Sequence, residues 1–252
     1  LAWAIMSGVC AGLMQATKET CVIAYASMFG AILALFLFAK VRDGYHINFK
    51  RAFRKRDLTA AIIVALFVSL PILSGFYSNP RGQIDAFLTY VNYLNRSGGP
   101  SIHDHPWYYY LKMLLLTRDA PKPWWTEALI MGLALVGSVV ALVRTSGPEP
   151  DIVTVRKVAL GRFLVFYTVL MVVVYSLIPY KTPWCALSFL HGMILLAGIG
   201  IAALVNWIPT KALKAAVIAL FLLGTVHLAK QSYRANFIYY ADTRNPYVYG
   251  HT

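Results

Sequence analysis

The stretch WCALSFLHGMILLAGIGIAALV, residues 184–205, decides the fold class of this protein. It carries no Asp, Glu, Lys or Arg, and its few polar side chains include Ser188 and His191. A helix needs about 20 predominantly apolar residues to cross the hydrocarbon of a bilayer, because each residue advances it by only about 1.5 Å. The stretch therefore predicts a membrane-spanning helix, in which we expect His191 to be neutral and buried against a neighbouring helix.

Six more segments meet the same criterion, several at the short end of its range: 1–17, 21–39, 59–77, 126–143, 163–179 and 213–229. Of the 252 residues, 59% are hydrophobic and 13% charged, and the mean hydropathy is +0.60. A soluble domain of this length needs more surface charge. We therefore expect an all-α integral membrane protein with about seven transmembrane helices in residues 1–230 and an external tail, residues 231–252. Because Leu1 lies inside an apolar run, we expect the chain to be an internal or C-terminal part of a longer protein.

The net charge of +13 arises from cations in short loops. That pattern is typical of membrane topology and contact with anionic lipids, and we expect no nucleic-acid partner. Seven Lys and Arg residues lie between the second and third spans, within residues 40–58. The positive-inside rule assigns this loop to the cytoplasm. Alternation then predicts a multi-pass protein of the plasma membrane, with residues 78–125 and the active face on the non-cytoplasmic side.

The external loop 78–125 is too long to be a mere connection. Apolar residues recur in it at helical spacing: Ile84, Phe87, Leu88, Val91 and Leu94. Polar residues stand opposite them: Asp85, Asn92 and Arg96. This pattern predicts an amphipathic helix lying at the membrane interface. The aromatic run that follows, residues 107–116, is too short to span, and we expect it to dip into the interface or to pack on the helix bundle.

Lys18 and Glu19 occupy the tight junction between the first two apolar segments. One interpretation is an ion pair that caps two helix ends. The other is an ammonium held at headgroup depth to bind a lipid phosphate, because ionisable groups at membrane depth are functional candidates by default. The sequence alone does not decide between these two interpretations.

His103, Asp104 and His105 form the second polar group. Alternate residues of an extended segment project to one side, so both imidazoles are candidate ligands for a divalent metal, although no cofactor is required. They are equally candidate hydrogen-bond donors to a phosphate leaving group. A polar loop with incidental histidines is the third interpretation.

Lys181 comes just before Pro183 and Trp184 at the start of the 184–205 helix. Proline suits the first turn of a helix, and tryptophan suits the membrane interface. Lys181 either snorkels, with its charged end in water, or binds a phosphate. Its position on the same side of the membrane as Lys18 and the histidines favours phosphate binding.

Three motifs together resemble one known family. The segment HPWYYYL (residues 105–111), followed by PW (123–124), is similar to an external-loop pattern of dolichyl-phosphate-mannose–protein mannosyltransferase-like enzymes. The turns TKE (17–19) and KTPW (181–184) resemble two further motifs of these enzymes, in the same order and on the same side of the membrane. The likeness covers most of the chain and is closest to the flippase-activity-associated subgroup.

This resemblance implies a GT-C fold, a membrane-embedded helical bundle that uses polyprenyl-phosphate-linked sugars on the non-cytoplasmic face. It implies that the lipid phosphate is bound by these residues: Lys18, Lys181, His103, His105, Tyr109 and Trp184. The acidic catalytic residues of the family would precede Leu1, and Glu19 and Asp104 are the carboxylates here that would substitute for them. Transfer needs such a base to deprotonate the acceptor and donors to stabilise charge on the departing phosphate.

The sequence thus leads to two hypotheses. The first is a glycosyltransferase that moves a sugar from a polyprenyl-phosphate donor to a glycan, lipid or protein acceptor. The alternative is a non-catalytic accessory that binds or helps to translocate lipid-linked sugars. An ordinary transporter is less favoured, because no carboxylates cluster inside the apolar segments.

Overall fold

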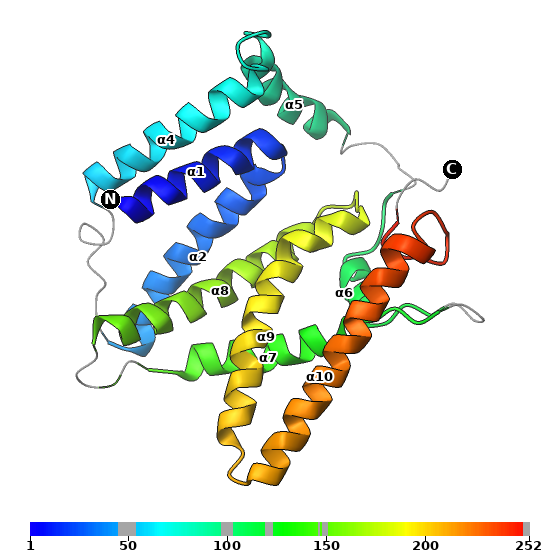
Figure 1. Cartoon of the computed structure of the whole chain (residues 1–252). Helices are drawn as coiled ribbons and strands as arrows, with labels where there is room; N and C mark the ends of the chain where they lie inside the picture. The colour runs from blue at the N-terminus through cyan, green and yellow to red at the C-terminus, as the bar shows by residue number, and fades with distance from the viewer. Residues whose placement is uncertain (45–53, 97–102, 119–122, 146, 148–150, 249–252) are drawn as a thin grey trace. The chain divides into compact units, whose positions relative to one another are not determined.

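The computed structural model describes residues 1–44, 54–96, 103–118, 123–145, 147 and 151–248. This part of the chain is helical and contains no β-strand, only two isolated bridges (Figure 1). Its helices, in chain order, are α1 (Ala2–Thr17), α2 (Cys21–Arg42), α4 (Lys55–Leu73), α5 (Gly82–Arg96), α6 (Tyr109–Leu115), α7 (Ala128–Val143), α8 (Ile152–Leu177), η1 (Pro183–Ala186), α9 (Leu187–Trp207), α10 (Lys211–Tyr233) and the π-helical turn η2 (Arg234–Ile238).

Five helical stretches in the described residues are long and apolar enough to cross a membrane: Cys21–Arg42, Lys55–Leu73, Ile152–Leu177, Pro183–Trp207 and Lys211–Ile238. The all-helical class is therefore confirmed, whereas the expected count of about seven spans is not. The helices α1 and α7 have 16 residues each. At about 1.5 Å per residue α7 falls short of the hydrocarbon thickness of about 30 Å. Helix α1 starts at the second residue of the sequence, so its length does not decide whether it spans.

Two helix boundaries differ from the hydropathy limits because polar residues also form helix. Helix α8 begins at Ile152, well before the predicted start at residue 163. The Oδ1 atom of Asp151 accepts a hydrogen bond from the backbone N–H of Thr154 (3.0 Å), which caps the first turn. Helix α10 continues to Tyr233, so the expected limit between residues 230 and 231 falls inside a helix.

The helices form two compact units, Leu1–Phe29 with Phe36–Pro100, and Gly30–Leu35 with Ser101–Thr252. In the first unit α1 runs beside α4 (Figure 1). A Cβ atom added to Gly8 would lie 2.4 Å from the backbone oxygen of Ala61, and one on Gly12 would lie 2.6 Å from that of Ala65. The two backbones are therefore in direct contact, as in membrane helix pairs built on small residues.

Helix α5 confirms the amphipathic helix predicted in the loop. Its residues Ile84, Phe87, Leu88 and Val91 are all more than half exposed. Its first turn is tied to the end of α4, where the Nε2 atom of Gln83 donates to the backbone oxygen of Leu70 (3.0 Å). The side chains of residues 92–96, and with them part of the predicted polar face, lie outside the described residues.

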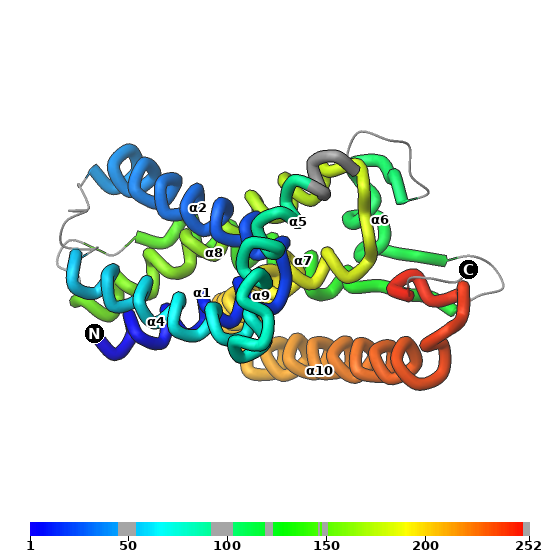
Figure 2. Tube along the Cα trace, turned by 90° about the horizontal axis from the view of Figure 1, so that it is seen from above, coloured from blue at the N-terminus to red at the C-terminus, as the bar shows by residue number. Residues whose placement is uncertain are grey.

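The second unit is built around the crossing of α7 and α9, with α8 packed on both and α10 along its edge (Figure 2). One cluster of buried apolar side chains comes from α7, α8 and α9: Leu133, Ala134, Ala141, Val165, Leu196 and Ala197. A Cβ atom on Gly137 would lie 1.9 Å from the backbone oxygen of Leu196, and one on Gly200 would lie 2.1 Å from that of Leu133. Each glycine thus admits the backbone of the other helix.

We expect Gly137→Ala to lower the free energy of unfolding by about 1–3 kcal/mol, because the added methyl group forces α7 away from α9. Thermal unfolding of the purified protein in detergent measures the change. Gly132→Ala is the matched control on the same helix, since a Cβ atom there meets nothing within 4 Å. Equal melting temperatures for the two variants would contradict the close crossing.

Candidate functional site

Two of the motifs found in the sequence meet in the second unit. Residues 103–105 pair with residues 179–181 as a short antiparallel bridge between Asp104 and Tyr180. The backbone N–H of His105 donates to the oxygen of Pro179 (3.1 Å), and that of Lys181 donates to the oxygen of His103 (2.9 Å). The His-Asp-His segment and the lysine turn therefore form one cluster, in which His103, Asp104, His105 and Lys181 are electrostatic neighbours.

The two imidazoles of this cluster pack against tyrosines. The ring of His105 stacks on Tyr109, with centroids 4.1 Å apart and planes at 12°. The ring of His103 meets Tyr180 edge-on at 5.0 Å. Burial lowers the pKa of His105, and the positive charges of His103 and Lys181 lower it further against the opposing effect of Asp104. His105 is therefore a neutral imidazole at neutral pH, able both to donate and to accept a hydrogen bond.

Lys181 is buried, with 1% of its surface exposed. Its ammonium donates to the backbone oxygen of Ile178. Burial lowers the pKa of Lys181, and the negative charge of Asp104 acts in the opposite direction. The snorkelling interpretation is wrong in this structure, because it needs the charged end of the side chain in solvent.

The sequence did not single out Tyr110, which holds the cluster on the helix bundle. Tyr110 is 1% exposed, and its hydroxyl donates to the backbone oxygen of Thr182 (3.2 Å). Its ring meets Phe189 of α9 edge-on at 5.5 Å. Burial raises the pKa of Tyr110, so the hydroxyl stays protonated as a donor. Part of the aromatic run 107–116 thus packs on the bundle, one of the two placements expected for it, whereas Trp107 and Leu115 are exposed.

An apolar pocket of about 230 Å³ begins one residue further along α6, at Leu111. It continues along α7, α8 and α9, where its walls include Leu135, Val169, Val173 and Met193. Thr168 also lines it, and the buried Oγ1 atom of this residue has no hydrogen-bond partner among the described residues. The pocket therefore reaches helix α6, whose Tyr109 stacks on His105 of the cluster.

The other expected site residues are placed as follows. Trp184 lies in η1 and is 39% exposed. Lys18 is exposed and Glu19 half-buried in the turn between α1 and α2, which belongs to the first unit. His191 is exposed on α9, so the expectation of a buried histidine is wrong. Among the described residues no three His, Cys, Asp or Glu side chains are grouped as metal ligands.

A second buried polar cluster ties the end of the chain to the start of α7. The Oε1 atom of Glu127 accepts hydrogen bonds from the Nε2 atom of Gln231 (2.8 Å) and from the hydroxyl of Tyr247 (3.4 Å). The Oε1 atom of Gln231 accepts in turn from the backbone N–H of Thr126 (2.8 Å). Beside them Trp125 is 1% exposed and donates to the backbone oxygen of Arg244 (2.7 Å).

Glu127 was not among the predicted site residues, because its polar partners are 104 and 120 residues away along the chain. The available signal was a lone carboxylate at the edge of an apolar segment, next to a Trp-Trp pair. Burial raises the pKa of Glu127, while the hydrogen bonds from Tyr247 and Gln231 oppose that change. The carboxylate is thus a half-buried acid in a packing contact between α7, α10 and the residues that follow α10.

The raised pKa makes the stability of this contact depend on pH. The folded protein holds the Glu127 proton more tightly than the unfolded chain does. Its contribution to stability is therefore fully present below the unfolded value of 4.5 and is lost as the pH rises through the folded-state pKa. We expect Glu127→Gln, which keeps an acceptor for Gln231 and Tyr247 without the charge, to flatten the fall in melting temperature as the pH rises above 4.5.

Glu127→Ala is the control for the hydrogen bonds themselves. It leaves Gln231 and Tyr247 without their acceptor, and we expect a loss of about 1–3 kcal/mol across the same pH range. Thermal unfolding of the three proteins at matched pH values gives both results. A pH dependence of Glu127→Gln equal to that of the parent protein would contradict the assignment.

Comparison with known proteins identified no relative: no family model, no curated protein and no solved structure matches this chain.

Proposed function

We propose that this protein is an integral membrane glycosyltransferase of the GT-C type. It takes a sugar from a polyprenyl-phosphate donor at the non-cytoplasmic face and transfers it to a glycan, lipid or protein acceptor. The observation that carries the proposal is the pairing of residues 103–105 with residues 179–181, which gathers two imidazoles, a carboxylate and an ammonium. Motifs that resemble those of the family supply two of these groups, His105 and Lys181.

The cluster has the chemistry that a departing lipid phosphate requires. Breaking the bond between sugar and phosphate leaves negative charge on the phosphate oxygens, and donors already in place stabilise that charge. Lys181 provides a positive charge within a poorly hydrated site, where Coulomb attraction is stronger than in water. In the proposed bound state its ammonium exchanges the Ile178 oxygen for a phosphate oxygen, and neutral His105 donates a hydrogen bond.

The lipid part of the donor also has a place in this scheme. A polyprenyl chain is apolar and must remain outside water while its phosphate reaches the cluster. The pocket that begins at Leu111 is apolar and runs along α7, α8 and α9. We propose that the first isoprene units of the donor lie there, with the phosphate at the end near Tyr109.

One feature of the cluster, its supply of carboxylates, supports the accessory function as a second candidate. Transfer requires a carboxylate base for the acceptor. In the described residues of the cluster the carboxylate is Asp104, whose charge acts on both Lys181 and His105, and the cluster holds no second carboxylate to serve the acceptor. A protein that binds or translocates lipid-linked sugars needs the phosphate-binding groups without the base.

The direct test uses the full-length protein in liposomes with defined polyprenyl-phosphate sugars. We expect Lys181→Met to slow release of the polyprenyl phosphate by roughly 10²-fold or more, since one oxyanion donor has that value in other enzymes. His191→Ala is the matched control, because His191 is exposed on the neighbouring helix and outside the cluster. Both variants are checked for folding by thermal unfolding.

The outcomes separate the two functions. Loss of transfer in Lys181→Met with full activity in His191→Ala supports the enzyme. Donor binding that depends on Lys181, without transfer by the parent protein, supports the accessory. Transfer that is unchanged in Lys181→Met and in His103→Ala would show that the phosphate site lies elsewhere.

The proposed topology is tested by cysteine labelling in intact cells, in a background without the three native cysteines. Trp107 is 64% exposed and Thr145 is also exposed. We expect a membrane-impermeant maleimide to label Trp107→Cys from outside and Thr145→Cys only after permeabilisation, because the positive-inside rule places them on opposite sides. The reverse pattern would overturn the proposed active face.

A further inference from the structure

Another pocket of the second unit lies at the opposite end of α7 from Glu127. It has a volume of about 330 Å³ and lies between the end of α7, the first half of α8 and the middle of α9. Apolar side chains line most of it: Val140, Leu160, Leu164, Leu195 and Ile199. Gly161 and Ala141 also line the pocket. A Cβ atom added to Gly161 would lie 3.2 Å from the Cβ atom of Ala141.

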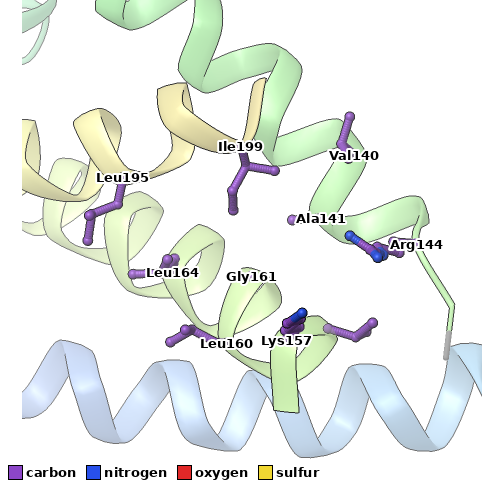
Figure 3. A pocket seen from close by; sticks show the side chains of 10 residues that line it. Val140, Ala141, Arg144, Lys157, Leu160, Gly161, Leu164, Leu195 and Ile199 are labelled. Carbon is purple, nitrogen blue, oxygen red and sulfur yellow. The ribbon is translucent and has the colours of Figure 1, made fainter. Parts of the chain in front are cut away.

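Two cations stand at one end of this pocket, Arg144 from α7 and Lys157 from α8. Figure 3 shows both at the same end, with Leu164 and Leu195 toward the other. Both cationic side chains are exposed. Behind them Arg162 is 1% exposed, and its Nη2 atom donates to the backbone oxygen of Arg144 (2.9 Å), which adds a third positive charge and joins α8 to the end of α7.

The pocket is open toward the surface that spanning helices present to lipid. Leu160 is 58% exposed and Leu195 43% exposed, so the apolar wall continues onto the outside of α8 and α9. The nearest acidic residue along the described part of α8 is Asp151, which caps the helix by accepting from the N–H of Thr154. None of the lining residues is acidic.

We propose that this pocket binds an anionic phospholipid. The phosphate lies between Arg144 and Lys157, and the first part of one acyl chain lies against Leu160, Leu164, Leu195 and Ile199. Charge complementarity and the apolar wall together favour this ligand. A free anion makes no apolar contacts with the wall, and a zwitterionic lipid carries less net negative charge for the two cations to bind. Such pockets between helices, with cations at their headgroup end, suit acidic lipids of the cytoplasmic leaflet, the side that the positive-inside rule assigns to residues 144–162.

This site is separate from the proposed sugar-donor site. The two pockets lie along the same three helices, α7, α8 and α9, but have different lining residues. The lysine proposed to bind the phosphate is Lys157 in this site and Lys181 in the donor site. A lipid bound at the second site joins α7, α8 and α9 at the end away from the histidine cluster. Its binding does not require that the protein transfer sugars.

The test is lipid retention by the full-length protein, released from nanodiscs that hold equal amounts of phosphatidylglycerol and phosphatidylcholine and analysed by native mass spectrometry. We expect the parent protein to retain phosphatidylglycerol preferentially. Replacement of Arg144 and Lys157 by Gln should each reduce that retention about fivefold, the value of one cation near an anionic lipid surface. Arg156→Gln is the matched control, because Arg156 is exposed next to Lys157 and does not line the pocket.

A second variant tests the apolar wall without a change of charge. Leu195→Trp fills the pocket from a partly exposed position, and we expect it to displace phosphatidylglycerol while the protein keeps its melting temperature. Short-chain glycerol phosphate, which has the anion and no acyl chains, should not compete. Equal losses in Arg156→Gln and Lys157→Gln, no loss in Leu195→Trp, or full competition by glycerol phosphate would each overturn the proposal.

Discussion

At the crossing of α7 and α9, Gly137 and Gly200 bring two helix backbones into contact, each glycine beneath a carbonyl oxygen of the other helix. Helices in lipid gain little from burying apolar side chains against one another, because the lipid tails are just as apolar. Close packing of backbone on backbone supplies the attraction instead, and dispersion grows with the number of atoms in contact. A cluster of buried apolar side chains from α7, α8 and α9 lies around this crossing.

The crossing also determines what lies at the two ends of these helices. The segment that precedes α9 carries Lys181 and pairs with residues 103–105. The segment that precedes α7 carries Glu127, which receives hydrogen bonds from Gln231 and Tyr247. At the far end of α7, Arg144 comes beside Lys157 of α8. One packing contact therefore holds a polar cluster at one end of the unit and a cationic pocket at the other.

Lys181 is a charged side chain that this unit keeps out of water. An ammonium removed from water loses several kcal/mol of hydration, which its partners must offset. Here the offset comes from the backbone oxygen of Ile178 and from the nearby charge of Asp104. Asp104 lies on one of the paired segments and Ile178 directly precedes the other, so the pairing and the buried charge support each other. A phosphate that replaced the Ile178 oxygen would neutralise the same charge, which is the physical basis of the proposed donor site.

Sequence by itself determined the helical class, the presence of membrane-length apolar helices and the amphipathic helix α5. These depend on composition and on periodicity within one segment, which short-range chemistry controls. Hydropathy alone predicted helix length less well, because α7 has the composition of a span but ends after 16 residues. Only the tertiary structure decided that residues 103–105 meet Lys181, that Lys181 is buried, that His191 is exposed and that Glu127 joins α10. Each of these depends on which helix faces come together, and that choice is made by contacts between residues tens to a hundred positions apart, whose spacing along the chain carries no trace of the pairing.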